Sequence, residues 1–397
     1  MAEERSYLKQ FTDLGLAEAI LRAVSAEGYT TPTPIQADVI PAMLAGHDVL
    51  GTAQTGTGKT AAFVLPLLNQ IAARGTPPRP KTATALIMSP TRELASQIAD
   101  NIRIYGQFMR VSVALVVGGA RAMPQIRALS RGVDIIVATP GRLLDHASSG
   151  AVRLDHTNIV VLDEADHMLD LGFMPAIREI LQMVAKPRQT VMLSATMPKQ
   201  IRNLAREFQK DPVQISAGSD SPAISRIAQS VVQTDNASKR HVLTTLLSAP
   251  EVGRAIVFTR TKRCADTVHL HLQNAGLSAG AIHGDKSQGE RSNALASFKS
   301  GRTSILVATD IAARGIDVDD ISHVFNYELP DAAEAYVHRI GRTARAGRSG
   351  IAISLCAPSE RNLLRGIERL IGTPIERHAG SFGQAANFDE PRRVARR

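Results

Sequence analysis

The sequence has few cysteines and no long apolar segment. Cys264 and Cys356 are the only two cysteines among 397 residues, and they lie far apart in the chain. This excludes a disulfide framework or a cysteine-based metal site and is typical of a reducing cytoplasm. No apolar run approaches the roughly 18 residues that a membrane-spanning helix needs, and residues 1–10 lack the apolar core of a signal peptide. We therefore expect a cytoplasmic protein with no membrane association.

Basic residues outnumber acidic ones in this chain. Lys and Arg number 46 against 37 Asp and Glu, which gives a formal charge of +9. A basic surface favours a polyanionic partner, and nucleic acid is the leading candidate. Many basic proteins bind no nucleic acid, so the charge needs a second observation beside it. The chain has about twice the usual length of one domain, so we expect two.

Short β-branched segments alternate with longer amphipathic segments in both halves of the chain. Fully apolar strands such as 159–162 (IVVL) are typical of a parallel sheet that is covered on both faces. The alternation predicts a doubly wound α/β fold, with a last helix over Ser359–Ile371. The predicted strands are 48–52, 85–89, 111–116, 135–138, 159–162, 190–194, 254–258, 279–282, 304–308, 323–325 and 350–355.

A segment of small and polar residues, 216–222 (SAGSDSP), interrupts this alternation and is the predicted linker. It separates an N-terminal domain, 1–215, from a C-terminal domain, 223–376. The remaining residues, 377–397, are rich in Gly, Ala and Arg and are predicted to form a basic, disordered tail. The arginines of this tail suit tethering of RNA phosphates, and they suit a solvated tail without a role equally well.

The segment from Ala53 to Thr60 (AQTGTGKT) follows a predicted strand and opens a predicted helix. Its glycines let the backbone curl so that N–H groups face phosphate oxygens, and the helix N-terminus adds its positive dipole end. Lys59 is expected to reach the β- and γ-phosphates of ATP, and the Thr60 hydroxyl to hold Mg²⁺. The expected nucleotide contacts are Thr55, Gly56, Thr57, Gly58, Lys59 and Thr60. The first position is Ala instead of Gly, but the strand–loop–helix setting supports the motif.

Acidic residues at the end of another apolar strand complete this predicted ATP site. Asp163 is expected to serve Mg²⁺ through a water molecule, because a carboxylate at the carboxyl end of a strand beside a phosphate loop suits that metal. Glu164 is then the group that orients and deprotonates the attacking water. The alternative, a helix N-terminus that is merely acidic, is common in proteins.

With these residues in place, the chain resembles the DEAD-box family of ATP-dependent RNA helicases. Residues Asp163–Asp166 read DEAD in one-letter code, the motif after which the family is named. Further family motifs occur in the family's order over roughly residues 11 to 371. The resemblance implies two tandem RecA-like domains, each a mainly parallel sheet with helices on both faces, and an RNA-stimulated ATP hydrolase. The short N-terminus and compact core look most like the bacterial RhlE-type enzymes.

The resemblance also assigns roles in the first domain. Gln36, at the end of a segment similar to the family's adenine motif, would hydrogen-bond adenine, and Phe11 would pack on the ring. A glutamine amide can pair bidentately with adenine. Ser194 and Thr196 match the motif that couples hydrolysis to RNA remodelling, a role that Asp166 and His338 are expected to share. The residues that resemble contacts to the RNA backbone are Pro90, Thr91, Arg92, Gly119, Thr139 and Arg142.

The second domain contains no second phosphate loop, so we do not expect a second ATPase. The segment His338–Arg345 (HRIGRTAR) instead carries arginines three residues apart, which suits an arginine finger, and the resemblance assigns this role to Arg342 and Arg345. It also places Asp317 at the ATP ribose. Glu328 stands where many relatives have Asp, a departure that keeps the charge and lengthens the side chain. The RNA contacts implied here are Gly284, Gln288, Arg291 and Thr309.

Because both halves carry groups for ATP, the predicted mechanism is a clamp. The two domains would close around ATP and RNA, bend one strand and locally unwind a duplex, and each ligand would tighten the binding of the other. We expect a monomer with little RNA sequence preference, whose protein partners belong to ribosome assembly or RNA turnover. Two alternatives remain open, namely an ATP-dependent RNA clamp or scaffold that unwinds little, and a processive DNA translocase.

Overall fold

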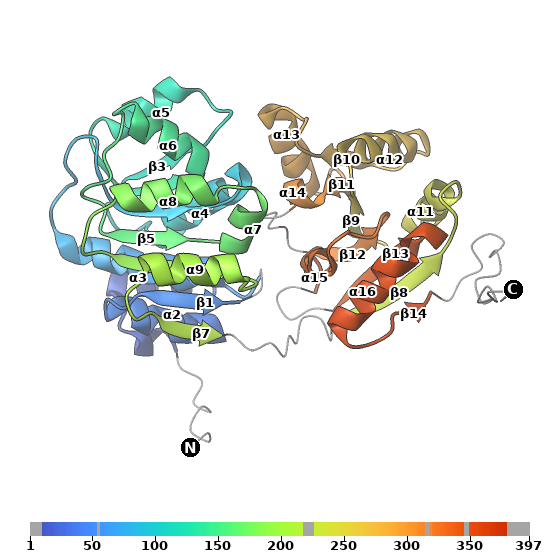
Figure 1. The fold of residues 1–397 in the computed structure, drawn as a ribbon, viewed down its shortest axis with the longest axis horizontal. Coiled ribbons are helices and arrows are strands. Elements are labelled where there is room, and N and C mark those ends of the chain that lie inside the picture. The colour runs from blue at the N-terminus through green and yellow to red at the C-terminus, as the bar shows by residue number, and fades with distance from the viewer. Residues whose placement is uncertain are drawn as a thin grey trace, which may run out of the picture. The chain divides into compact units, whose positions relative to one another are not determined.

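The chain forms two compact units, Met1–Ser219 and Asp220–Arg397, in its computed structural model. The structure describes residues 10–53, 56–216, 226–313, 318, 320–344 and 349–378. Each unit contains one seven-stranded sheet (Figure 1). Among the described residues, no helix has the length and apolar character needed to cross a membrane.

The sheet of the first unit is parallel throughout, in the order β3-β4-β2-β5-β6-β1-β7. The sequence predicts every one of these strands except β7, which lies at the edge and exposes three of its four residues. Such a strand lacks the apolar run by which buried strands are detected. The strands are β1 Val49–Thr52, β2 Ala83–Met88, β3 Val113–Val116, β4 Val133–Ala138, β5 Ile159–Leu162, β6 Gln189–Ser194 and β7 Val213–Ser216.

Helices cover both faces of this sheet because successive strand residues point to opposite sides. Ala85 and Ile87 pack against one group of helices, and Leu86 and Met88 pack against the other. The first group, with the 3-10 helix η1 Phe11–Leu14, is α1 Glu18–Ala26, α2 Pro34–Leu44, α3 Lys59–Arg74 and α4 Arg92–Tyr105. The second group is α5 Ala122–Leu129, α6 Pro140–Ser148, α7 Ala165–Asp170, α8 Met174–Met183 and α9 Lys199–Phe208.

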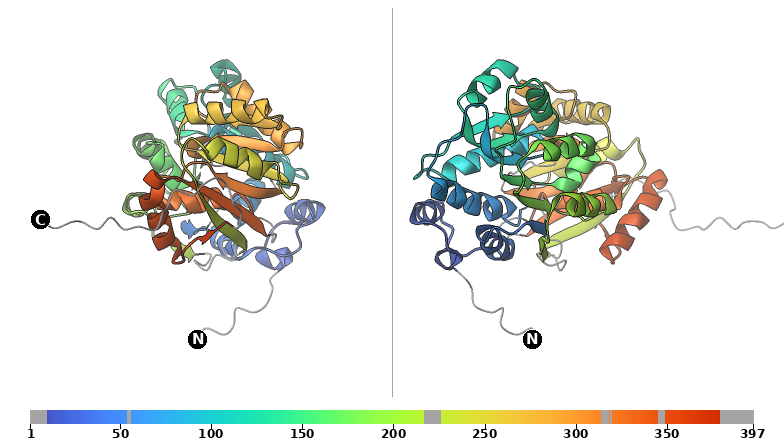
Figure 2. Two further views of the ribbon diagram at one scale, coloured as in Figure 1. Left: turned by 90° about the vertical axis from the view of Figure 1, so that its right-hand side faces the viewer. Right: turned by 60° about the vertical axis from the view of Figure 1, so that its left-hand side comes forward.

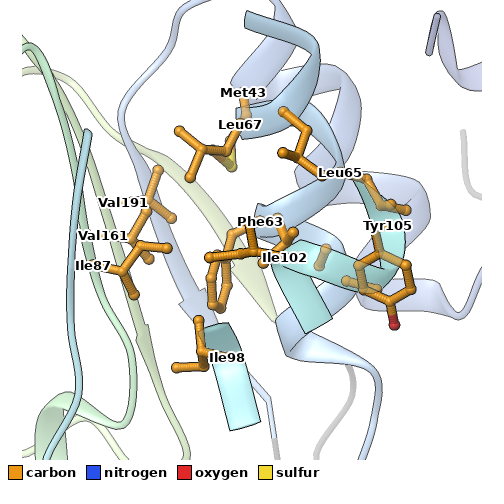
Figure 3. Packing of buried hydrophobic residues seen from close by; sticks show 14 of the residues in the cluster. Met43, Phe63, Leu65, Leu67, Ile87, Ile98, Ile102, Tyr105, Val161 and Val191 are labelled. Carbon is orange, nitrogen blue, oxygen red and sulfur yellow. The ribbon is translucent and has the colours of Figure 1, made fainter. Parts of the chain in front are cut away.

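The first of these two cores fixes the helix that follows the phosphate loop. Phe63 of α3 and Ile98 of α4 pack toward Ile87, Val161 and Val191 of three neighbouring strands (Figure 3). All five side chains are fully buried. Burial of each contributes about 1.5–3 kcal/mol, so α3 is held firmly against the sheet and its N-terminus has a defined position.

The sheet of the second unit is also parallel throughout, in the order β10-β11-β9-β12-β13-β8-β14. The sequence predicts all of its strands except β8 and β14. Ser216 is the last residue of β7 and Arg377 of β14, so both lie in strands and not in the predicted linker and tail. Residues 217–222 and 379–397 of those segments lie outside the described residues. The strands are β8 Ile227–Gln233, β9 Arg254–Thr259, β10 Ala279–Ile282, β11 Ile305–Thr309, β12 Ile321–Asn326, β13 Gly350–Cys356 and β14 Glu376–Arg377.

Helices cover both faces of the second sheet as well. The yellow helices α11 and α12 lie on one side of it and the red helix α16 on the other (Figure 2). The predicted last helix is present, preceded by a short 3-10 turn, η2 Pro358–Glu360. The helices are α11 Lys239–Leu247, α12 Lys262–Asn274, α13 Gln288–Lys299, α14 Asp310–Ala313, α15 Ala333–Ile340 and α16 Arg361–Ile371. The predicted doubly wound α/β fold is therefore confirmed.

A buried ion pair connects three segments of the second unit. Lys239 Nζ lies 2.5 Å from Glu360 Oε2, and it donates a hydrogen bond of 2.8 Å to the carbonyl oxygen of Tyr327. Glu360 in turn accepts hydrogen bonds from the backbone N–H groups of Leu329 and Ala357. Both charged side chains are almost fully buried, so each depends on the other for compensation of its charge.

We expect Glu360→Ala to lower the free energy of unfolding of the second unit by about 3–5 kcal/mol, because it leaves the Lys239 ammonium buried without a counter-charge. Urea unfolding followed by circular dichroism measures this effect; the chain contains no tryptophan to serve as a fluorescent probe. The control is Asp285→Ala, which breaks an ion pair with Lys262 that is more than half exposed. Its effect should stay below about 1 kcal/mol, and equal effects of the two variants would contradict the prediction.

Candidate functional site

Six of the predicted functional segments of the first unit lie at one edge of its sheet. All strands are parallel, so their carboxyl ends meet at this edge, where α/β proteins bind ligands. β1, β6 and β5 are neighbours and are followed by the phosphate loop, Ala195–Thr196 and Asp163–Asp166. β2, β4 and β3 are neighbours and are followed by the segments predicted to contact RNA, which are Pro90–Arg92, Thr139–Arg142 and Gly118–Gly119. One edge therefore carries two adjoining groups of predicted contacts.

The phosphate loop has the curled backbone that its glycines predict. Gly56 and Gly58 have φ angles of 86° and 88°, and α3 begins directly after them at Lys59. Lys59 is 6% exposed, and none of the described residues accepts a hydrogen bond from its Nζ. A buried ammonium without an acceptor is costly, so the loop fits an anionic ligand. Thr55 lies outside the described residues.

Gln36 is attached to this loop. Its Oε1 accepts a hydrogen bond of 2.9 Å from the backbone N–H of Thr33, and its Nε2 donates one of 3.2 Å to the carbonyl oxygen of Gly58. The contact is close, because a β-carbon at residue 58 would lie 2.4 Å from Nε2. Phe11, by contrast, is 5% exposed and packs in the first core. Its contact with adenine stays a prediction.

Asp163 and Glu164 follow β5 and are both buried. The N–H of Glu164 donates to Asp163 Oδ1 at 3.0 Å. Burial raises the pKa of Asp163 to about 7, which the positive charge of Lys59 opposes and the negative charge of Glu164 reinforces. A cation close to Asp163 would favour its charged form, so this carboxyl fits a divalent metal ion. Glu164 has a φ of 52°, a left-handed conformation that is rare outside glycine.

Asp166 connects the ends of β5 and β6. Its Oδ2 accepts hydrogen bonds of 2.8 Å from both the backbone N–H and the hydroxyl of Thr196. Its own N–H donates to Ser194 Oγ at 3.1 Å. The structure thus brings together the three residues of the first unit that the sequence assigns to coupling.

His167 belongs to this site and was missed by the sequence prediction. Its Nδ1 lies 3.3 Å from Glu164 Oε2, and the side chain is buried. The signal was available, since residues three apart on a helix are neighbours and His167 follows Glu164 by three. The imidazole holds the carboxylate that is predicted to act as the base.

The predicted RNA contacts of the first unit also lie together. Gly119 has a φ of 67°, and a β-carbon there would lie 1.8 Å from Nη1 of Arg92. Arg142 donates a hydrogen bond of 3.0 Å to the carbonyl oxygen of Ala120, and the Gly118 N–H donates to Thr139 Oγ1 at 3.4 Å. Thr91 caps α4, the helix that Arg92 begins. Two arginines and a close-packed glycine therefore share one surface.

The second unit places its predicted RNA contacts at the ends of two neighbouring strands. Gly284 follows β10, Gln288 and Arg291 lie in the first turns of α13, and Thr309 is the last residue of β11. Asp317 and Arg345 lie outside the described residues. Arg342 is buried, and its Nε donates to the carbonyl oxygen of His338 at 3.3 Å.

Arg339 is a structural residue that the sequence prediction passed over. It is 1% exposed, and its Nη2 donates a hydrogen bond of 2.7 Å to Asp310 Oδ2. Its Nη1 donates one of 2.6 Å to the carbonyl oxygen of Glu328. The guanidinium therefore joins α15, which carries His338, to the segments after β11 and β12.

Comparison with known proteins decides the family. The DEAD/DEAH box helicase family matches residues 33–204, and the helicase conserved C-terminal domain matches 238–347. The DEAD-box ATP-dependent RNA helicase CshA of Geobacillus kaustophilus is 43% identical over 367 residues, covering 92% of this chain and 78% of the relative. This chain belongs to the DEAD-box ATP-dependent RNA helicases. CshA of Bacillus subtilis is 42% identical, covering 92% of this helicase and 73% of its own length.

Solved structures agree with the fold of this DEAD-box helicase. Dbp5 of S. cerevisiae bound to RNA and ADP BeF3 is 32% identical with a TM-score of 0.83, covering 93% of this chain and 95% of that one. Mss116p bound to ssRNA and AMP-PNP is 28% identical with a TM-score of 0.84, covering 96% and 81%. The expected architecture of two tandem RecA-like domains is confirmed.

We expect Gly119→Ala in this helicase to weaken the binding of single-stranded RNA by roughly tenfold, the effect of losing about 1.4 kcal/mol of contact energy. The added methyl group overlaps the guanidinium of Arg92 and forces it to move. Fluorescence anisotropy with a labelled RNA measures the affinity.

The matched control for this prediction is Gly150→Ala. Gly150 has a φ of 69°, almost that of Gly119, but a β-carbon there meets nothing within 4 Å. Both variants carry the same backbone strain, and only one displaces an arginine. Equal RNA affinities of the two variants would contradict the role of Arg92.

Proposed function

We propose that this helicase binds ATP at the carboxyl ends of β1, β6 and β5 and the RNA backbone at the carboxyl ends of β2, β4 and β3, and that ATP hydrolysis drives local unwinding of duplexes. The observation that carries the proposal is Lys59. Its buried Nζ finds no acceptor among the described residues, and it lies in a glycine-rich loop at a helix N-terminus. That arrangement suits a nucleotide phosphate.

Gln36 retains the hydrogen-bonding capacity to recognise adenine. An amide oxygen has two lone pairs and an amide nitrogen has two hydrogens. Thr33 uses one lone pair and Gly58 one hydrogen. One acceptor and one donor remain, which is the pair that adenine N6 and N7 require. The backbone of Gly56, Thr57 and Gly58 is proposed to hold the phosphates, together with that of Thr55.

Thr60 and, through a water molecule, Asp163 are proposed to hold Mg²⁺. The raised pKa of the buried Asp163 carboxyl supports this, because a neighbouring cation compensates for the lost solvation of its charge. When bound, Mg²⁺ neutralises charge on the β- and γ-phosphates. Glu164 is proposed to accept the proton of the attacking water, while His167 fixes the direction of its carboxylate.

Asp166 and Thr196 are proposed to couple hydrolysis to RNA remodelling. Asp166 lies two residues after the proposed base and is bonded to the segment after β6. A change at the phosphates therefore reaches that segment through two hydrogen bonds. His338 is proposed to take the corresponding part in the second unit.

The second unit is proposed to supply the arginine finger and the rest of the RNA contacts. Arg342 and Arg345 would stabilise charge on the transferred phosphate, and Asp317 would bind the ribose. Gly284, Gln288, Arg291 and Thr309 would hold the RNA backbone. If both ligands need both units, ATP and RNA each tighten the binding of the other by the same factor. The bent RNA strand would then release its complementary strand.

Subfamily, partners and location are also proposals. The likeness to RhlE-type enzymes stays a prediction, and the relatives named above are CshA proteins. We propose a cytoplasmic monomer that acts in ribosome assembly or RNA turnover. A duplex-release assay separates unwinding from the alternative, an RNA clamp that releases few strands.

We expect Glu164→Gln to reduce RNA-stimulated ATP hydrolysis by about 10²–10⁴-fold, because the amide cannot accept the proton. ATP binding should persist, since the amide keeps the size of the side chain. Steady-state ATPase assays with and without single-stranded RNA, beside nucleotide-binding measurements, test this. ATP turnover of the unaltered protein that ignores RNA, or responds only to DNA, would refute the proposed function.

We expect Arg342→Ala to lower RNA-stimulated ATP hydrolysis by about 10³–10⁵-fold, the usual contribution of an arginine finger. Affinity for ATP without RNA should remain, because the first unit holds the phosphates. Since Arg342 is buried, urea unfolding must show that the variant is folded. Arg365→Ala, at an exposed position of α16, is the control, and a loss no larger than that of this control would contradict the finger assignment.

A further inference from the structure

The turn that carries Gly284 is held by side chains of one helix, α12. The turn runs from His283 to Lys286 and is closed by a hydrogen bond of 3.1 Å from the Lys286 N–H to the His283 carbonyl oxygen. It leads directly from β10 into α13, and α12 packs against β10. The direction of this turn therefore sets the direction in which α13 starts.

Asp266 of α12 binds both ends of the turn with one oxygen atom. Its Oδ1 lies 3.0 Å from His283 Nε2 and 2.9 Å from Lys286 Nζ. A carboxylate only accepts hydrogen bonds, so Nε2 of His283 carries a proton in this arrangement. His283 is 1% exposed, which means that one end of the turn is anchored inside the unit.

The charge on Asp266 is well supported by these two partners. Burial alone would raise its pKa, but the hydrogen bonds from His283 and Lys286 outweigh that effect and lower the pKa. His269 lies one helical turn further along α12, and burial lowers its pKa, as does the charge of Lys286. Lys286 is then the cation that pairs with the carboxylate.

The start of α13 is fixed to the turn by its own cap. Ser287 N–H donates to Glu290 Oε2 at 2.8 Å, and the Glu290 N–H donates to Ser287 Oγ at 3.3 Å. This capping box leaves little freedom between Lys286 and the first turn of the helix. Gln288 and Arg291, which lie in that part of α13, therefore move with the turn.

A second connection from α12 to the turn is weaker. Lys262 Nζ lies 2.5 Å from Asp285 Oδ1, but the two side chains are 55% and 65% exposed. Exposed pairs of this kind contribute little. Asp266 makes the stronger of these two connections, because it binds the turn through two partners and one of them, His283, is buried.

We propose that Asp266 is a positioning residue for RNA binding, which holds the turn 283–286 and the start of α13 so that Gly284, Gln288 and Arg291 together face the RNA backbone. The inference rests on the proposed function, because those three residues are its RNA contacts. Asp266 itself contacts no RNA in this proposal. It acts by keeping the three RNA contacts correctly placed relative to one another. Displaced contact groups bind RNA more weakly even though the groups themselves are still present.

The test is the RNA dependence of ATP hydrolysis by the full chain. Asp266→Ala should raise the KM for single-stranded RNA roughly three- to tenfold and change kcat at saturating RNA less than about twofold. Asp266→Asn keeps an oxygen that can accept both hydrogen bonds but loses the charge, so its KM should fall between those of the wild type and Asp266→Ala. The control is Thr267→Ala, which removes an exposed hydroxyl from the same helix and should leave both constants unchanged.

A parallel measurement on Arg291→Ala distinguishes failure of the positioning role of Asp266 from failure of the proposed RNA contacts. A raised KM for Arg291→Ala with an unchanged KM for Asp266→Ala overturns the positioning role and leaves the RNA contacts standing. Unchanged KM values for both variants overturn the proposed RNA contacts of the second unit. A loss of kcat at constant KM would also refute positioning. If Asp266→Ala does not fold, Asp266→Asn carries the test and must raise KM at least about twofold.

Discussion

The parallel direction of every strand is the constraint on which both units depend. In a parallel sheet each strand must return by a crossover, and each crossover leaves the sheet at the same edge. In the first unit this gathers the loops of six neighbouring strands at one rim, although the residues concerned range from Gly56 to Thr196. Strand order then divides this edge, with the proposed phosphate-binding residues after β1, β6 and β5 and the proposed contacts to the RNA backbone after β2, β4 and β3. The grouping of motifs follows from the topology.

The partners of a buried charged group indicate whether the group is structural or is available to a ligand. Lys239 and Glu360 compensate each other and are further hydrogen-bonded to backbone groups, and Arg339 is paired with Asp310. Lys59 is also buried, yet no described residue accepts a hydrogen bond from its Nζ. A folded protein tolerates such an ammonium when a ligand completes the site. This contrast supports an anionic ligand at Lys59, in agreement with the proposed nucleotide site, and it does so independently of the family.

The sequence was informative where patterns are local. Apolar runs located the buried strands, but β7 and β14 at the sheet edges have too few buried residues to stand out, and β8 mixes polar residues into its run. The phosphate loop and the acidic motif were found because their chemistry lies in adjacent residues. His167 could have been predicted, because its partner Glu164 lies only three residues away in the sequence. Arg339 could not, because its partners lie 11 and 29 residues away. Asp266 has its partners 17 and 20 residues onward, across a strand, and no local pattern indicates them.

The bond between Gln36 and Gly58 has a consequence for nucleotide choice. The side chain that is proposed to meet the base and the backbone that is proposed to curl around the phosphates form one mechanical element, because a single amide connects them. A base that cannot pair with Gln36 would leave the remaining donor and acceptor of this amide unsatisfied while Thr33 and Gly58 still hold it in place. The proposed base recognition and the proposed phosphate binding would therefore depend on one side chain, and a change at Gln36 would affect both.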